Sequence, residues 1–103
     1  MATIALGNDV LTVVVVFTVP PDQQAGFVRQ LEQVAAEHSR HEGFVCCAIH
    51  RSVDGLRVVE YIQWRTRAHF EVMLAAQAAD GHVNKPPFPA DVHVYEVAAV
   101  VLP

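Results

Sequence analysis

Two polar side chains in the segment Arg57–Arg65, Glu60 and Trp64, offer the clearest chemistry in this sequence. The segment is rich in β-branched and aromatic residues and predicts a strand, and a spacing of four places both side chains on one face of it. An indole N–H only donates hydrogen bonds and suits a carbonyl or phenolate oxygen. A carboxyl group facing an apolar pocket can act as a general base or as a neutral donor. The alternatives are that Trp64 packs in the core and that Glu60 meets solvent or pairs with Arg51 or Arg57.

The other candidate groups are less specific. Cys46 and Cys47 are adjacent, so on a strand they would point to opposite faces, and we predict two reduced thiols rather than a redox pair. The six histidines form neither an HxH nor an HExxH pattern, and we therefore predict no metal site. His38 and His41 suit the C-terminus of a helix. A glycine-rich phosphate loop and a Gly-x-Ser-x-Gly motif are both missing from the sequence, so nothing predicts a nucleotide or flavin cofactor.

The composition limits the class of protein. Of 103 residues, 52% are apolar and only 17% charged, against about 25% in average soluble proteins. A net charge of −4 provides no basic field, so we expect no nucleic-acid partner. The apolar run from Val10 to Val19 is too short to cross a membrane, and no basic residue precedes Arg29, which argues against a secretory signal. We expect a cytoplasmic protein. Because it has few charged residues, we also expect part of its apolar surface to be buried against another surface.

Four segments carry the β-branched and apolar residues that predict strands. Pro20 and Pro21 end the first, because proline cannot donate to a ladder. Asp54-Gly55, between the second and third, predicts a hairpin turn, since glycine accepts a positive φ without penalty. The predicted strands are Leu11–Val19, Phe44–Ser52, Arg57–Arg65 and Val92–Leu102.

Two helices are predicted between these strands. Asp22 can cap the first, which Gly43 ends, and Thr66 can cap the second. The residues between 79 and 90 include three prolines and a glycine, and we predict a loop there, a natural lid over a cavity mouth. The predicted inward side chains are Phe27, Leu31, Val34, Ala35 and His38 in the first helix and Phe70, Met73 and Leu74 in the second.

The order strand, helix, strand, strand, helix, strand predicts an α+β fold of the ferredoxin-like βαββαβ class. In this fold a four-stranded antiparallel sheet carries both helices on one face. We expect a flexible leader over residues 1–9 and a single domain over residues 10–103. Because the first strand is apolar on both faces and the helices cover only one, we expect a second copy of the chain to cover the other, giving a homodimer.

The run from His50 to Trp64, preceded by Gly43-Phe44 and followed by Phe70, resembles the antibiotic biosynthesis monooxygenase family. That family carries a Ser-x-Asp-Gly turn, an Asn-Tyr-x-x-Trp strand and then a helix. The resemblance extends roughly from Leu11 to Val101. It implies a dimeric α/β barrel and a cofactor-independent monooxygenase that uses O2 to convert an anthrone, naphthol or hydroquinone of an aromatic polyketide into a quinone.

The resemblance also implies a site. Trp64 matches the family tryptophan, which with the family asparagine donates hydrogen bonds to the substrate oxygen. Glu60 stands in place of that asparagine, and Phe70 stands where anthrone-oxidising relatives often carry tyrosine. Glu60 and Trp64 are therefore the catalytic candidates, and the substrate-binding candidates are Phe70, His50, Ile62, Met73, His82 and Lys85. Two alternatives are a non-oxidative cyclase or isomerase in which Glu60 moves a proton, and a non-catalytic dimeric protein that binds a ligand.

Overall fold

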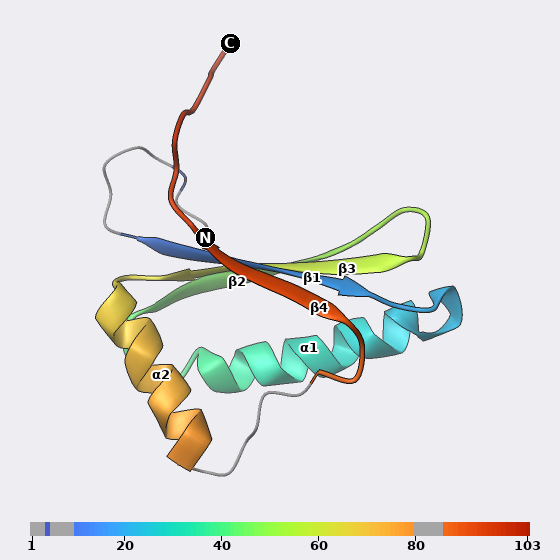
Figure 1. Cartoon of the computed structure of the whole chain (residues 1–103), viewed down its shortest axis with the longest axis horizontal. Helices are drawn as coiled ribbons and strands as arrows, with labels where there is room; N and C mark the ends of the chain where they lie inside the picture. Colours follow the sequence, from blue (N-terminus) through green and yellow to red (C-terminus); the bar gives the residue numbers. More distant parts are fainter. Residues whose placement is uncertain (1–3, 5–9, 80–85) are drawn as a thin grey trace.

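The computed structural model describes residue 4, residues 10–79 and residues 86–103. Its sheet has the strand order β2-β3-β1-β4, with every neighbouring pair antiparallel, and both helices lie on one side of it (Figure 1). This arrangement confirms the predicted ferredoxin-like fold. The elements are β1 (Leu11–Thr18), a 3-10 turn η1 (Pro21–Gln23), α1 (Gln24–His38), β2 (Phe44–Arg51), β3 (Arg57–Trp64), α2 (Arg67–Ala79) and β4 (Ala90–Tyr95).

The hydrophobic core lies between the sheet and the helices, on what we call the helix side. Alternate residues of β1 point there, and the partners that face them across β3 point the same way. Removing such side chains from water supplies roughly 1.5–3 kcal/mol each. The buried core residues are Val13, Val15, Phe17, Val19, Phe27, Leu31, Val58, Trp64 and Met73.

The opposite face of the sheet, which we call the open side, is also largely apolar. Val14 and Val16 of β1 lie there beside Val59 and Tyr61 of β3, and all four are half-buried. Thr12 and Gln63 are more deeply buried on the same face. The expectation that β1 is apolar on both faces is therefore confirmed.

The turn between β2 and β3 is held by side chains as well as by its glycine. Gly55 has a φ of 83°, and the Ser52 N–H donates to the Arg57 carbonyl at 3.0 Å. The Asp54 carboxylate accepts from the Ser52 hydroxyl at 2.7 Å and from the Leu56 N–H at 3.0 Å. These bonds, led by the Ser52 hydroxyl, hold the pKa of Asp54 below its usual value. The predicted Asp-Gly hairpin is confirmed.

The start and end of α1 differ from prediction. Pro21 opens a 3-10 turn one residue before Asp22, and α1 begins at Gln24 without a side-chain cap. Since proline is preorganised for a first helical position, Asp22 falls inside the turn and its carboxylate is past the capping position. At the other end, α1 stops at His38, well before Gly43. Gly43, at a φ of 87°, instead leads the chain into β2.

Each helix buries fewer residues than predicted. Phe27 and Leu31 are buried, but Val34 is 42% exposed, because an offset of three residues turns it about 60° from Leu31 around the helix axis. Leu74 is 40% exposed, while Met73 is buried. The cause is visible in Figure 1, where α2 starts at the sheet and runs away from it, so that its later turns leave the core.

The last strand is shorter and earlier than predicted. β4 covers Ala90–Tyr95, and the chain from residue 96 to residue 103 has no regular structure. Tyr95 pairs with Thr12, so any residue after Glu96 would need a partner before Leu11, the first residue of β1. The tail instead runs away from the sheet, and its Val101 and Leu102 are almost fully exposed (Figure 1).

Parts of two predictions lie outside the described residues. They are most of the leader at residues 1–9, and the portion of the 79–90 loop that carries His82 and Lys85. Among the described residues, no helix is long and apolar enough to cross a membrane.

Candidate functional site

Glu60 lies in the middle of β3 and points to the helix side of the sheet. Its partner across β1 is Val15 and its partner across β2 is Ile49, so apolar side chains flank the carboxyl group on both sides. Only 8% of Glu60 is exposed. A carboxylate in such surroundings has lost most of its hydration, and burial raises the pKa of Glu60.

No basic side chain among the described residues neutralises this carboxyl group. The two ion pairs of the described residues are formed by His69 and His93, and Glu60 takes part in neither. Arg57 lies an odd number of residues from Glu60, so its side chain points to the open side, and Arg51 is exposed at the end of β2. The alternative in which Glu60 meets solvent or pairs with one of these arginines is therefore wrong.

The hydrogen-bond donor to Glu60 is Cys47, whose Sγ lies 3.5 Å from Oε2. Cys47 pairs with Ile62, which places it diagonally across from Glu60 on the same face. Burial first, and the neighbouring carboxylate second, raise the pKa of the Cys47 thiol to about 12. Sequence reasoning missed this contact, although counting back along both strands from the Asp54-Gly55 turn would have found it.

Cys46 points the other way and lies 3.7 Å from Oε1 of Gln63 on the open side. Both cysteines are free and half-buried. The prediction that the adjacent thiols point to opposite faces of the sheet is confirmed.

Trp64 closes the other end of the site and is only 1% exposed. Its ring meets Phe44 edge-on at a centroid distance of 5.4 Å and lies 6.2 Å from Phe70 in a tilted contact. Its indole N–H has no hydrogen-bond acceptor among the residues that the structure describes. Unpaired buried donors are rare in native proteins. Trp64 therefore packs in the core, and its N–H has no partner there from the described residues.

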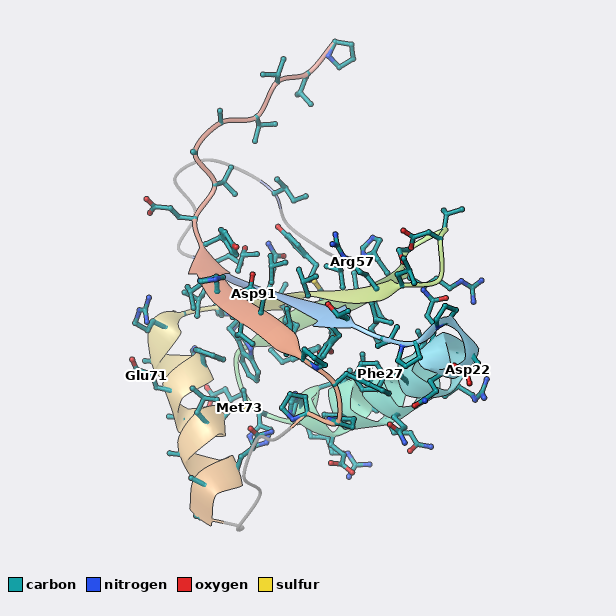
Figure 2. The ribbon with its side chains drawn as sticks, turned by 45° about the vertical axis from the view of Figure 1, so that its right-hand side comes forward. Asp22, Phe27, Arg57, Glu71, Met73 and Asp91 are labelled. Carbon is teal, nitrogen blue, oxygen red and sulfur yellow. The ribbon has the colours of Figure 1, made fainter. Side chains whose placement is uncertain are left out.

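Three further predicted residues stand beside this pair. Ile62 lies between Glu60 and Trp64 on the same face of β3. From α2, Phe70 contacts Trp64, and Met73 is buried in the same core cluster as Trp64. Figure 2 shows Met73 of α2 and Phe27 of α1 on the same side of the sheet. The structure thus brings together five of the eight predicted site residues in an apolar setting.

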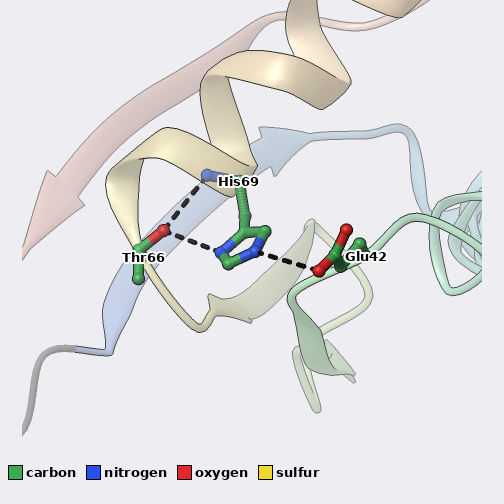
Figure 3. A network of polar contacts seen from close by, with 3 residues as sticks. All are labelled: Glu42, Thr66 and His69. Carbon is green, nitrogen blue, oxygen red and sulfur yellow. Dashed lines mark hydrogen bonds and ion pairs between the residues drawn. The ribbon is translucent and has the colours of Figure 1, made fainter.

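The first turn of α2 is anchored by a small polar network (Figure 3). The Thr66 hydroxyl accepts from the His69 N–H at 3.2 Å and lies 2.7 Å from His69 Nδ1, which confirms Thr66 as the cap. On its other side, His69 Nε2 lies 3.9 Å from an oxygen of Glu42, whose side chain is exposed. This network orients the helix that carries Phe70 and Met73.

Gly43 allows α2 to approach β2 closely. A Cβ built on Gly43 would lie 2.2 Å from Cγ of His69 and 2.4 Å from its Cβ. The Arg65 N–H also donates to the Gly43 carbonyl, at 2.6 Å. Glycine is therefore required here for two reasons: its backbone has a positive φ, and His69 leaves no room for a Cβ.

The structure does not bring the remaining predicted residues to this place. His50 pairs with Val59 and points to the open side, away from Glu60, so its expected contact with the pocket is not supported. His82 and Lys85 lie outside the described residues. Separately, a shallow hollow of about 410 Å³ is lined by Val16, Thr18, Arg57, Pro89, Ala90 and Asp91, none of which is a predicted site residue.

Comparisons with known proteins place this arrangement in a family. Residues 10–88 match the family described as antibiotic biosynthesis monooxygenase. The chain is also 42% identical over 85 residues to the tetracenomycin-F1 monooxygenase of Streptomyces glaucescens, a match that covers 82% of this chain and 76% of that protein. The chain belongs to the antibiotic biosynthesis monooxygenase family. It is accordingly an enzyme of the monooxygenase class.

Solved structures of similar fold agree with this membership. SnoaB, a cofactor-independent oxygenase from Streptomyces nogalater, superposes with a TM-score of 0.74 at 26% identity, covering 92% of this chain and 98% of its own. A monooxygenase from Streptomyces coelicolor, solved with nanaomycin D, superposes with a TM-score of 0.69 at 24% identity, over 90% and 91% of the two chains. The description of SnoaB supports the expectation that this family member needs no cofactor.

Proposed function

We propose that this monooxygenase oxidises an anthrone, naphthol or hydroquinone of an aromatic polyketide to a quinone, with O2 as co-substrate and no cofactor. One observation carries the proposal. Two buried polar groups of opposite type share one face of β3: the Glu60 carboxyl, which has no cation beside it in the described part of the chain, and the Trp64 N–H, which has no acceptor there. Their Cα atoms are about 13 Å apart at roughly 3.3 Å per residue, a span suited to a fused-ring substrate.

The two groups suit the chemistry of such a substrate. The Glu60 carboxylate would remove a proton from the substrate, and the Trp64 N–H would hold the oxygen on which negative charge develops. The resulting electron-rich carbanion reduces O2 and forms a carbon–oxygen bond. For an anthrone the balance is a CH2 group plus O2 giving a carbonyl plus one water. The surrounding apolar side chains Ile62, Phe70 and Met73 would keep water from the reactive anion.

Relatives support this substrate class. The relative from Streptomyces glaucescens is named for its action on tetracenomycin F1, and the one from Streptomyces coelicolor was solved with nanaomycin D bound. Phe70 brings no hydroxyl to the site, so the polar contacts to substrate would come from Glu60 and Trp64.

The test is O2 uptake and quinone formation by the pure protein with a panel of anthrones and dihydroxynaphthalenes. We expect Glu60→Gln to lower kcat by roughly 10²–10⁴-fold, the usual contribution of a general base, and Trp64→Phe to lower it by a smaller factor. Glu71→Gln on the exposed face of α2 is the matched control and should retain full activity. Full activity in a Glu60→Gln, Trp64→Phe double variant would refute the assignment of the site.

The same assay without oxygen separates the alternatives. Product formation under strict anaerobiosis would identify a cyclase or isomerase that uses Glu60 to move a proton. Tight binding of the panel compounds with no turnover in air or without it would identify a non-catalytic binding protein. Either result would overturn the proposed oxidation.

We further propose that the chain is a homodimer formed through the open side. In the described part of the chain no helix covers this face, which exposes part of Val14, Val16, Val59 and Tyr61. The chain also carries few charges to solvate such a surface. A second copy can cover it with the same face, as two-fold symmetry requires.

The test is the molar mass in solution by light scattering over a range of concentrations. Val14→Asp places a charge at the centre of the open side and should yield a monomer. Val72→Asp, at a residue of α2 that is 66% exposed, is the control and should leave the mass unchanged. A monomeric wild-type protein at all concentrations would refute the dimer.

A further inference from the structure

Cys47 holds a position in the site that is set by the backbone. β2 and β3 pair in a fixed register in which Cys47 faces Ile62 and Ile49 faces Glu60. The thiol and the carboxyl group therefore lie on the same face and two residues apart along the pair, and Sγ comes within 3.5 Å of Oε2. The contact follows from the register and does not depend on a long, freely rotating side chain.

No other titratable group faces this carboxyl among the described residues. The neighbour from β1 is Val15, and the neighbours from β2 are Ile49 and Cys47 itself. The helices present the apolar side chains of Phe27, Leu31, Phe70 and Met73 to the core of the helix side. His38 of α1 is half-buried and pairs with Gln77 of α2, but the pKa of Glu60 is shifted by burial and by Cys47 and not by His38. Among the described residues, Cys47 is thus the side chain that forms a hydrogen bond with the Glu60 carboxyl group.

The thiol is suited to donate rather than to react. Its pKa of about 12 keeps it protonated over the working range of an enzyme, so the S–H remains available to the carboxylate. Burial raises the pKa of Glu60, and the hydrogen bond from the Cys47 thiol partly offsets this by lowering it.

We infer that Cys47 is a positioning residue for the reaction: its S–H donates to Oε2 of Glu60 and favours the ionised form that acts as base. The inference rests on the proposed function, because it assigns a role to Cys47 only if Glu60 removes the proton. No proton leaves the thiol, and no bond to sulfur forms or breaks.

The first experiment is the pH dependence of kcat/KM in three variants. Cys47→Ala removes the donor, Cys47→Ser replaces it by a hydroxyl, and Cys46→Ala removes the adjacent thiol that faces the open side. A hydrogen bond contributes about 0.5–1.5 kcal/mol, so Cys47→Ala should lower kcat/KM by roughly three- to tenfold on the acidic limb. The loss should vanish at higher pH, where Glu60 is ionised in every variant. Cys47→Ser should restore most of it, and Cys46→Ala should match the wild type.

The second experiment needs no turnover. In a Cys46→Ala background the infrared S–H stretching band reports Cys47 alone, and its shift to lower wavenumber marks the bond to Glu60. We expect Glu60→Ala to move this band back toward that of an unbonded thiol. An unmoved band would overturn the contact.

The outcomes separate this inference from the proposed function. If Glu60→Gln stays fully active, the proposed base is wrong and the role of Cys47 falls with it. If Glu60→Gln is inactive but Cys47→Ala keeps the wild-type pH profile, Glu60 remains the base and the positioning role of Cys47 alone is refuted. An equal loss in Cys47→Ala at all pH values would mean a packing role and would also refute it.

Discussion

Replacing Gly43 with alanine tests whether the close contact between Gly43 and His69 positions α2, which carries residues of the candidate site. The residue stands between α1 and β2 with a φ of 87°, and a Cβ there would lie within 2.6 Å of three atoms of His69. Such distances are far inside van der Waals contact, so either β2 or the first turn of α2 must move. Because α2 carries Phe70 and Met73, the movement should reach the site as well as the stability of the fold.

The size of the effect can be worked out from its parts. The left-handed backbone costs a non-glycine residue about 1–2 kcal/mol. Forcing extra volume into a packed contact adds about 1–3 kcal/mol, and displacing His69 loses its hydrogen bond to Thr66, about 1 kcal/mol more. We therefore expect Gly43→Ala to lower the free energy of unfolding by about 3–6 kcal/mol, which at this chain length lowers Tm by at least about 12 °C.

Gly55→Ala is the matched control. Gly55 has nearly the same φ, 83°, but a Cβ there would meet only Pro21, at 3.3 Å from its Cβ. The backbone cost is thus kept and the severe overlap is removed, so the expected loss is about 1–2 kcal/mol. The difference between the two variants measures the contact with His69.

The assay is chemical denaturation of both variants, at one protein concentration because a dimer would make stability depend on it. A second substitution sharpens the test. His69→Ala should rescue Gly43→Ala only in part, since it removes Cγ and Cδ2 but leaves the Cβ of residue 69 at 2.4 Å from the added carbon, whereas His69→Gly should restore more of the loss. Equal losses in Gly43→Ala and Gly55→Ala, or full rescue by His69→Ala, would refute this account.

Three further predictions concern single side chains. Burial raises the pKa of Glu60, so the free energy of unfolding is highest at low pH, where this carboxyl group is neutral. That contribution is lost as the pH rises through the folded pKa. Glu60→Gln should therefore gain free energy of unfolding relative to the wild type as the pH rises above the usual carboxyl pKa and through the raised folded pKa, and a constant difference would contradict this. Thr66→Ala should cost about 0.5–2 kcal/mol in denaturation as the cap of α2 is lost, while an unchanged midpoint would show that the cap contributes nothing. The Cys47 thiol, with its pKa of about 12, should resist iodoacetamide at about pH 8 in the native protein and react once it is unfolded, as read by mass spectrometry of the peptide; rapid native labelling would contradict the burial.

Much of the fold could be predicted because it depends on interactions between residues that are close in the sequence. Strong β-branched runs, the Asp54-Gly55 turn and the Thr66 cap each act over a few residues, and the structure confirms all three. The end of β4 could not be predicted in this way. Val97–Leu102 is as apolar as a strand, but whether it pairs depends on where β1 begins, which lies more than eighty residues away in the sequence.

The candidate site could likewise be predicted only where it depends on spacing within one strand. The spacing of Glu60 and Trp64 placed them on one face, and the structure confirms that placement. Which face it would be, and what would stand beside Glu60, depended on the register between β2 and β3. That register brings in Cys47, which sequence reasoning treated as an inert thiol, and it takes His50 away to the other side.

The adjacent cysteines have a consequence for how this site can change. If β2 slid by one residue so that Cys46 faced Ile62, every side chain of the strand would change sides, yet a thiol would again stand beside Glu60. If it slid by one the other way, His50 would come to face Glu60 and offer an imidazole in place of Ile49. Gain or loss of one residue in the turn between the strands is therefore a short route from a carboxyl–thiol pair to a carboxyl–imidazole pair on the same scaffold.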